Sequence, residues 1–188
     1  MPGIVKYVIH IFVLHASIAK PLGEGGKLQL ATDMAELEFS LNAFLADGSQ
    51  GKRSSSLERI GEEYKALRAM RWVVPCSSSR VLMVERRPLL FLDNAFLASP
   101  ERTAGLSPLV VLHHILVRSP LPLPHTLHGW QETEYVRWVD EHSPEEALSL
   151  IDGSMTYWEK RDRNGEDETA AEYIHLARAV LQTVQRTS

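Results

Sequence analysis

The sequence predicts an all-α protein, and three observations support this fold class. Apolar residues recur at spacings of three and four along much of the 188-residue chain, which is the period of a helix with one buried face. Serine followed by proline stands where helices begin, at Ser107-Pro108 and Ser143-Pro144. The strand-like residues 81–84 have no evident partner strand, and a lone hairpin is marginal in water. We therefore expect a helical bundle of about seven or eight helices.

Composition excludes several classes of function. The chain is 44% hydrophobic and 23% charged, as is usual for a globular protein. Its net charge of −4 leaves no basic excess to attract nucleic acid or anionic lipid. The single cysteine, Cys76, cannot form an internal disulfide, so a reducing compartment is the default. We expect no nucleic-acid partner.

The first expected helix spans residues 4–19 and is apolar on most sides. Two interpretations remain open. It could be a buried helix, or residues 1–19 could be a signal peptide of a small secreted or lumenal helical protein, with Ser17 to Ala19 as the cleavage site. His10 and His15 interrupt the apolar run, which is too short and polar to span a bilayer. These histidines favour the buried helix.

A rigid corner is expected after this helix. Lys20 is expected to hydrogen-bond the last free carbonyls of the helix, and Pro21 ends it because proline has no N–H to donate. Gly23, Gly25 and Gly26 then let the backbone turn through conformations that other residues avoid. The glycines also suggest a phosphate-binding loop, but the Walker spacing, the hydroxyl residue and the preceding strand are missing. We interpret the stretch as a structural corner.

Two more helices are expected in the N-terminal half. The second spans residues 27–46, and a polar loop follows it. Its predicted buried stripe is Leu30, Met34, Leu37, Leu41 and Phe44. The third is capped by Ser55 or Ser56. Its predicted inner face is Leu57, Ile60, Tyr64 and Leu67.

The middle of the chain fits a helical pattern poorly. Residues 71–86 have no helical period, and we interpret them as a loop that ends in a short helix at most. Pro88 suits a first helical position and opens a short apolar helix that extends to Leu97. A loop then leads to Ser107.

The C-terminal half is clearly helical. Ser107-Pro108 opens a helix that ends at Arg118. Prolines then alternate with leucine and predict a stiff extended spacer, with Pro120, Pro122 and Pro124. Further helices are expected at residues 131–141, after a capping box that begins at Ser143, and at residues 167–186.

No combination of residues indicates catalysis, a cofactor or a metal. His125 and His128 form at most half of a metal site, because zinc needs three or four ligands. Cys76 has no histidine or basic neighbour to make it reactive. We therefore expect no enzyme and no cofactor. Trp130 is a candidate partner contact if exposed, whereas Trp138 is expected in the core.

Several of these stretches resemble the C-terminal region of subunit 5 of the conserved oligomeric Golgi complex. They are residues 15–38, 64–68, 87–91, 114–120 and 130–142. The similarity covers most of the chain. Its specific part is the run Pro-Leu-Gly-Glu-Gly-Gly-Lys within the corner.

The resemblance implies a function. It implies helical bundles as in vesicle-tethering complex subunits, without catalysis. It also implies a peripheral protein on the cytosolic face of the Golgi apparatus membrane, in intra-Golgi retrograde transport and the maintenance of Golgi glycosylation. The implied partners are other subunits of the complex, chiefly subunit 7.

The chain departs from the family pattern in two ways. Family members are several times longer, so residues 1–188 are expected to be the C-terminal helical bundle region of a longer subunit. Related chains also run almost directly from the Tyr64–Arg68 motif to Arg87. We therefore expect a looped-out insertion at residues 72–86, either genuine or translated from intron sequence.

Overall fold

The helices predicted from the sequence are present in the computed structural model, which describes residues 2–20, 24–46, 56–71, 103, 105–161 and 168–187. Within these ranges the chain is all-α, which confirms the predicted fold class. The elements are α1 (Pro2–Ile18), α2 (Glu24–Ala46), the 3-10 helix η1 (Ser56–Arg59), α3 (Glu62–Arg71), α5 (Pro108–Arg118), α6 (Pro124–Leu127), α7 (Glu132–Glu141), α8 (Pro144–Arg161) and α9 (Glu168–Thr187). The predicted helix that opens at Pro88 and the predicted insertion at residues 72–86 lie outside the described residues.

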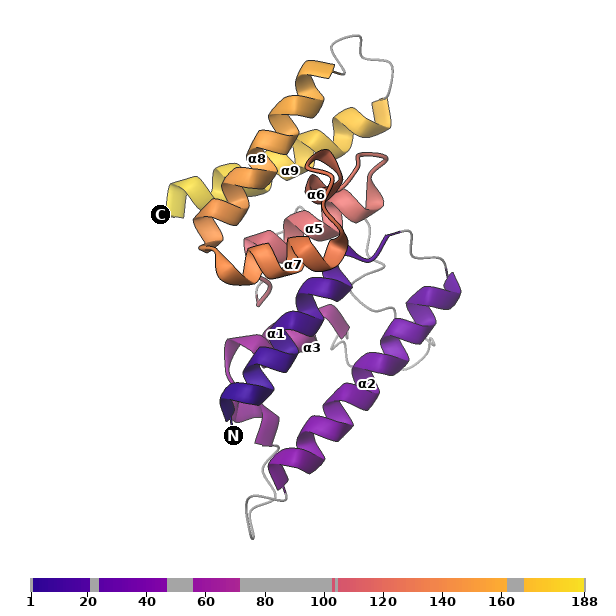
Figure 1. Cartoon of the computed structure of the whole chain (residues 1–188), viewed down its shortest axis with the longest axis vertical. Coiled ribbons are helices and arrows are strands. Elements are labelled where there is room, and N and C mark those ends of the chain that lie inside the picture. Colours follow the sequence, from indigo (N-terminus) through magenta and orange to yellow (C-terminus); the bar gives the residue numbers. More distant parts are fainter. Residues whose placement is uncertain are drawn as a thin grey trace, which may run out of the picture.

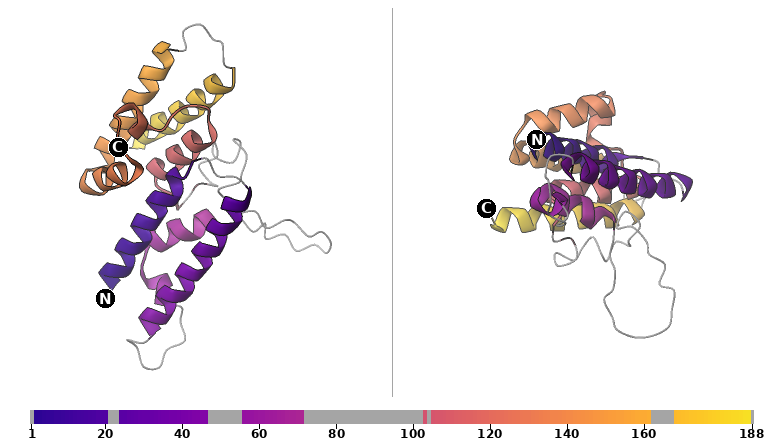
Figure 2. Two further views of the ribbon diagram at one scale, coloured as in Figure 1. Left: turned by 45° about the vertical axis from the view of Figure 1, so that its right-hand side comes forward. Right: turned by 90° about the horizontal axis from the view of Figure 1, so that it is seen from below.

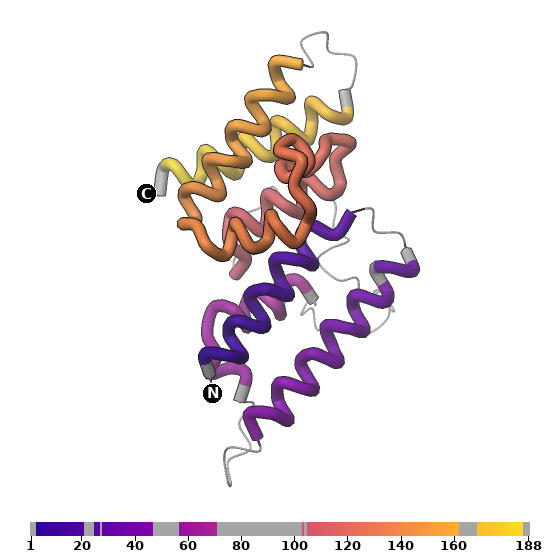
Figure 3. Tube along the Cα trace, viewed as in Figure 1, coloured from indigo at the N-terminus to yellow at the C-terminus, as the bar shows by residue number. Residues whose placement is uncertain are grey.

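The helices form two tiers along the long axis of the molecule (Figure 1). The lower tier holds α1, α2 and α3, and the upper tier holds α5 to α9. α1 rises from the lower end and its last turns reach the upper tier, whereas α2 runs back down the edge of the lower tier (Figure 3). α3 packs against both α1 and α2, and it is seen between them in the left view of Figure 2.

Each tier has its own hydrophobic cluster. The N-terminal cluster consists of Val5, Ile9, Val13, Ala16, Met34, Leu41, Leu57, Ile60, Leu67, Met70 and Val110. The C-terminal cluster contains buried side chains from α1 and from α5 to α9, among them Leu14, Ile18, Leu112, Ile115, Leu116, Tyr135, Ile151, Met155, Ile174, Ala177 and Leu181. Most of the apolar stripes predicted from the sequence therefore point into one of two cores.

α1 joins the two clusters. Val5, Ile9 and Val13 belong to the N-terminal cluster, while Leu14 and Ile18 belong to the C-terminal cluster. All of these side chains are at most 4% exposed. This packing favours the buried-helix interpretation of α1 over a cleaved signal peptide. None of the helices in the described part of the chain is long and apolar enough to cross a lipid bilayer.

The expected third helix is two elements instead of one. Gly61 has a φ of +97° and separates η1 from α3. This left-handed conformation cannot continue a right-handed helix and is one that glycine adopts at little cost. Leu57, Ile60 and Leu67 are nevertheless buried in the same cluster. The predicted inner face is right, and the predicted continuity is wrong.

Helix starts in the upper tier follow the predicted caps. The Ser107 side chain accepts a hydrogen bond from the Val110 N–H at 3.3 Å. At the start of α8, Ser143 Oγ accepts from the Glu146 N–H at 3.3 Å, and Glu146 Oε2 accepts from the Ser143 N–H at 2.9 Å. These reciprocal bonds complete a capping box. The hydrogen bonds to Ser143 lower the pKa of Glu146.

The proline-rich connection does not stay extended throughout. Pro124 opens the short helix α6, where its missing N–H costs nothing. Leu121, Leu123 and Pro124 are buried, and the two leucines belong to the C-terminal cluster. The expected stiff spacer is therefore partly a helix, because burial of its apolar side chains holds it against the core.

Candidate interaction site around Trp130 and Trp138

A row of neighbouring aromatic side chains lies on the upper tier. The ring centroids of His128 and Trp130 are 4.9 Å apart, those of Trp130 and Trp138 5.8 Å, and those of Trp138 and His142 4.1 Å. Both tryptophans are partly buried against the C-terminal cluster. Such rows combine large apolar faces with polar edges, which suits contact with another protein.

Local backbone features position this row. Gly129, with a φ of +69°, turns the chain between α6 and Trp130. α7 then begins at a capping box in which Glu134 Oε2 accepts from the Gln131 N–H at 2.7 Å. One helical turn separates Trp138 from His142, whose Nδ1 lies 2.7 Å from the Trp138 carbonyl oxygen. This bond holds the imidazole against the indole.

A groove of about 720 Å³ lies beside the row, between α6, α7 and α8. On one side it is lined by His128, Trp138 and His142, and the α8 side includes Gly153 and Tyr157. A Cβ atom at Gly153 would have no neighbour within 4 Å. Trp138, predicted in the core, is partly buried against the C-terminal cluster and also lines this groove. Trp130 is partly buried and stays a predicted partner contact.

A second cavity of about 600 Å³ lies between the tiers. Its lining includes His10 of α1, Glu63 of α3 and Asp140 of α7. Asp140 ties α1 to α7, because its carboxylate is 3.5 Å from His10 Nε2 and accepts a hydrogen bond from the Tyr7 hydroxyl at 3.3 Å. The negative charge of Asp140 raises the pKa of Tyr7. These contacts join α1 to α7.

A buried polar network joins α1, α5 and α7. Ser17 donates its hydroxyl hydrogen to the Leu14 carbonyl oxygen at 2.7 Å, and its oxygen lies 2.9 Å from His113 Nδ1. His113 Nδ1 must therefore donate to Ser17, so that Nε2 accepts from the Tyr135 hydroxyl at 2.8 Å. The hydrogens donated by Ser17, His113 and Tyr135 then have one acceptor each, and the His113 imidazole is neutral.

Burial keeps two adjacent imidazoles uncharged. His113 is 1% exposed and His114 5%. Burial lowers the pKa of each to about 3, helped by His114 and then His125 in the case of His113, and by Arg118 in the case of His114. Burial also raises the pKa of Tyr135. A histidine that stays neutral over the physiological range contributes to packing here and cannot act as an acid.

The predicted half metal site has no second half in the described part of the chain. His125 is buried, with its ring centroid 5.5 Å from that of Tyr135, while His128 is exposed and stacks on Trp130. Among the residues whose positions are given, no three His, Cys, Asp or Glu side chains gather closely enough to hold a metal ion. Cys76 lies outside the described residues.

Lys20 caps a different helix from the one expected. Its Nζ donates to the carbonyl oxygens of Leu116 at 3.2 Å, Ser119 at 2.6 Å and Leu121 at 2.7 Å. These acceptors lie at and beyond the C-terminal end of α5, where a cation also suits the helix dipole. All three ammonium hydrogens are used, and partial burial lowers the pKa of Lys20.

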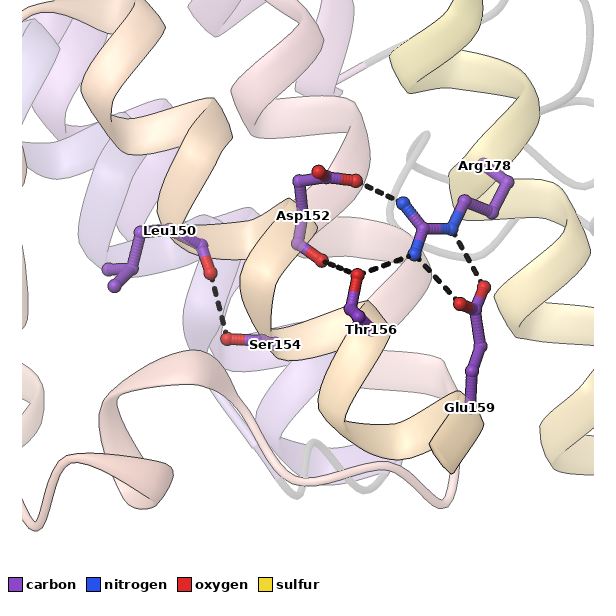
Figure 4. A network of polar contacts seen from close by, with 6 residues as sticks. All are labelled: Leu150, Asp152, Ser154, Thr156, Glu159 and Arg178. Atoms are coloured by element: carbon purple, nitrogen blue, oxygen red, sulfur yellow. Dashed lines mark hydrogen bonds and ion pairs between the residues drawn. The ribbon is translucent and has the colours of Figure 1, made fainter. Parts of the chain in front are cut away.

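Arg178 of α9 fastens α8 and was not predicted from the sequence. Its guanidinium donates to both Glu159 oxygens at 2.7 and 2.8 Å, to Thr156 Oγ1 at 2.9 Å and to Asp152 (Figure 4). The side-chain hydrogen bond to Arg178 lowers the pKa of Glu159. The sequence does place Asp152, Thr156 and Glu159 on one face of α8, at spacings of four and three residues.

The predicted corner is only partly described. Pro21 and Gly23 lie outside the described residues. α2 begins at Glu24, before the expected start at Lys27, so Gly25 and Gly26 lie in its first turn. There they are helical residues, and any turn made by Pro21 and Gly23 stays a prediction.

Two curated proteins are similar to most of this chain. Subunit 5 of the conserved oligomeric Golgi complex from Arabidopsis thaliana is 29% identical over 163 residues, which is 86% of this chain. The mouse subunit 5 is 29% identical over 171 residues, which is 88% of this chain. The resemblance to subunit 5 of the conserved oligomeric Golgi complex is confirmed.

The chain spans only part of these subunit 5 proteins, namely 17% of the Arabidopsis protein and 18% of the mouse protein. No family model matches the sequence. No solved structure matches the chain.

Proposed function

We propose that this chain is a helical region of a non-enzymatic subunit of a Golgi vesicle-tethering complex, which acts in intra-Golgi retrograde transport and maintains Golgi glycosylation. The observation that carries the proposal is the similarity to subunit 5 of the conserved oligomeric Golgi complex over 86% and 88% of the chain, in a plant and in a mammal.

The chemistry of the described side chains supports a scaffold role. The most elaborate polar groups, around His113 and Arg178, join helices to one another. His113 is neutral and shielded from solvent, and the carboxylates beside Arg178 are paired with it. The polar chemistry of these two sites is therefore used in packing.

Partners and location follow from the same proposal. The protein would bind other subunits of the complex, chiefly subunit 7, and would sit on the cytosolic face of the Golgi membrane as a peripheral protein. The aromatic row of His128, Trp130, Trp138 and His142 supplies one contact surface, because it offers large apolar faces at the surface of a rigid helical tier.

Tagged full-length protein in its own cells tests this function. We expect subunit 7 and further subunits of the complex to co-purify with it. We also expect loss of the gene to leave cell-surface glycans incompletely processed, as measured by glycan mass spectrometry. Normal glycans together with purification free of other subunits would contradict the proposal. A mature chain that starts at Lys20 would instead favour the secreted helical protein.

Replacement of Trp130 by alanine tests the contact surface. We expect recovery of subunit 7 to fall about tenfold, since truncated aromatic anchors often cost over 1 kcal/mol of binding. His15→Ala, at an exposed position of α1, is the matched control and should leave recovery unchanged. Equal recovery with both variants would remove Trp130 from the interface.

A further inference from the structure

The helix α2 is apolar on two faces, and among the described residues only one of these faces packs on a core. The inner face is Leu30, Met34, Leu37, Leu41 and Leu45, which all pack on the N-terminal cluster. Among the described side chains of this long helix, only Met34 and Leu41 are buried. Phe44, predicted in the inner stripe, is 47% exposed.

The outer face carries a second stripe with regular spacing. Steps of four and three residues alternate along Leu28, Thr32, Ala35, Phe39, Asn42 and Ala46. This alternation keeps one seam on one side of a helix. Among the described large apolar side chains of the helix, its two large members are the most exposed, with Leu28 at 72% and Phe39 at 77%.

The side chains of the outer stripe suit a second helix. Leu28 and Phe39 lie about three turns apart and can act as anchors. Ala35 lies between them and Ala46 beyond them, so another backbone can approach closely. The seam has two polar members, of which Thr32 donates its hydroxyl hydrogen to the Leu28 carbonyl oxygen of its own helix. The other is Asn42, and a polar seam residue of this kind fixes the register of paired helices.

Charge narrows the choice of partner. The described charged side chains of α2 are Asp33, Glu36 and Glu38, all acidic. Glu36 is exposed and lies one turn from Thr32 and Phe39, at the border of the outer stripe. A second copy of α2 would therefore bring like charges together, whereas lysine or arginine on the facing helix would be attracted.

We propose that the outer stripe of α2 binds an amphipathic helix of another protein, with aliphatic seam residues flanked by lysine and arginine. The expectation that the partner is another subunit of the Golgi complex rests on the proposed function. The surface itself is argued from the exposure, spacing and charge of α2.

The test places a photo-reactive benzoylphenylalanine at position 39 of the full-length protein in intact cells and identifies cross-linked peptides by mass spectrometry. A cross-link to a helical segment of another protein, with the stated seam and basic flanks, is the expected result. The proposal would be overturned by a cross-link to residues 88–97 of the same chain, to a second copy, or to a segment of different chemistry. The absence of any cross-link would overturn it as well. The same probe at Tyr157 of α8, 48% exposed, is the matched control and should not capture that segment.

Substitutions test the energetics with the partner identified by the cross-link. Phe39→Glu should weaken its binding to the full-length protein about 30-fold, as for a central anchor. Glu36→Lys should weaken it less, by about threefold, because rim charges contribute less. Both residues are exposed, so unchanged circular dichroism should accompany the loss. Unaltered affinity in both variants would overturn the proposal.

The two proposals can fail separately. If the cross-linked helix has the stated chemistry but belongs to a protein outside the Golgi complex, and no subunit of the complex co-purifies, the surface is right and the proposed function is wrong. If the protein co-purifies with the complex while position 39 cross-links to nothing, the function stands and the surface is wrong.

Discussion

The helices α2 and α9 are both long, yet α9 buries more of its described side chains. α9 buries Ala170, Ile174, Leu176, Ala177 and Leu181. It packs against α5 and α8, and Arg178 adds a polar attachment to α8 (Figure 4). α2 buries Met34 and Leu41 among its described side chains.

The difference lies in how each sequence distributes its apolar residues. The exposed side of α9 is rich in polar residues, such as Glu172, His175 and Gln182, so its apolar residues gather on the face that the core covers. α2 divides its apolar residues between opposite faces, and a helix at the edge of a tier can bury only one. A long apolar helix therefore does not by itself indicate a large share of the core.

Acid should affect the α9 side of the molecule most. The pKa values of His113 and His114, about 3 in the folded protein, lie below the value of about 6.5 in the unfolded chain. Stability is therefore full above pH 6.5 and falls as the pH drops, by about 2 kcal/mol for each histidine at pH 5. Thermal unfolding followed by circular dichroism should show this fall in Tm.

The same experiment has a regional readout. α9 packs on α5, which carries both histidines, so hydrogen exchange at pH 5 should accelerate more in α9 than in α2. His114→Leu should flatten the pH dependence by about half, while the exposed control His175→Gln should retain it. A Tm that stays constant from pH 7.5 to 5 would show that the two imidazoles are not buried.

Truncation of Ile174 should give the next largest effect. Ile174 is 8% exposed and belongs to the C-terminal cluster, so Ile174→Ala should lower the free energy of unfolding by about 3 kcal/mol. Urea unfolding measures this change. Leu28→Ala in α2 is the matched control, and a similar loss there would contradict the difference in burial between the helices.

Removal of the Arg178 attachment should cost less. Arg178→Met keeps much of the side-chain volume and removes the contacts to Asp152, Thr156 and Glu159. The carboxylates are partly exposed and screened by solvent, so we expect a loss of about 1 kcal/mol. The loss should shrink at 1 M salt. A loss that does not depend on salt would indicate packing instead of charge.

The smallest effect is expected on the outer face of α2. Phe39 is 77% exposed, so Phe39→Ser should change the free energy of unfolding by no more than about 0.5 kcal/mol. Urea unfolding of the full chain without partners measures this value. A loss above about 2 kcal/mol would mean that Phe39 packs inside the chain.

Much of the fold could be predicted because it depends on local chemistry. The caps at Ser107 and Ser143 and the periodic stripes need only neighbours along the chain. The break at Gly61 was missed because glycines in general can adopt a positive φ at little cost. The sequence alone does not show which glycine does so, and in this fold Gly61 does, between η1 and α3. Local sequence thus predicts where helices form better than where they break.

The functional surfaces were harder to predict because they depend on distant contacts. Trp138 has a core-like spacing in α7, but the position of α8 leaves it lining a groove. Arg178 is matched to its carboxylates only after α9 lies across α8. The outer stripe of α2 follows from spacing, but its exposure depends on which elements cover the helix.

The contact between Lys20 and α5 has a consequence for the order of folding. The ammonium group and the carbonyls it caps are 96 to 101 residues apart in the sequence. During synthesis α1 and Lys20 leave the ribosome long before α5 does, so the cap is present before the helix that requires it. Because Lys20 reaches these carbonyls only when α1 packs against α5, the last turn of α5 should fray until the two helices have docked.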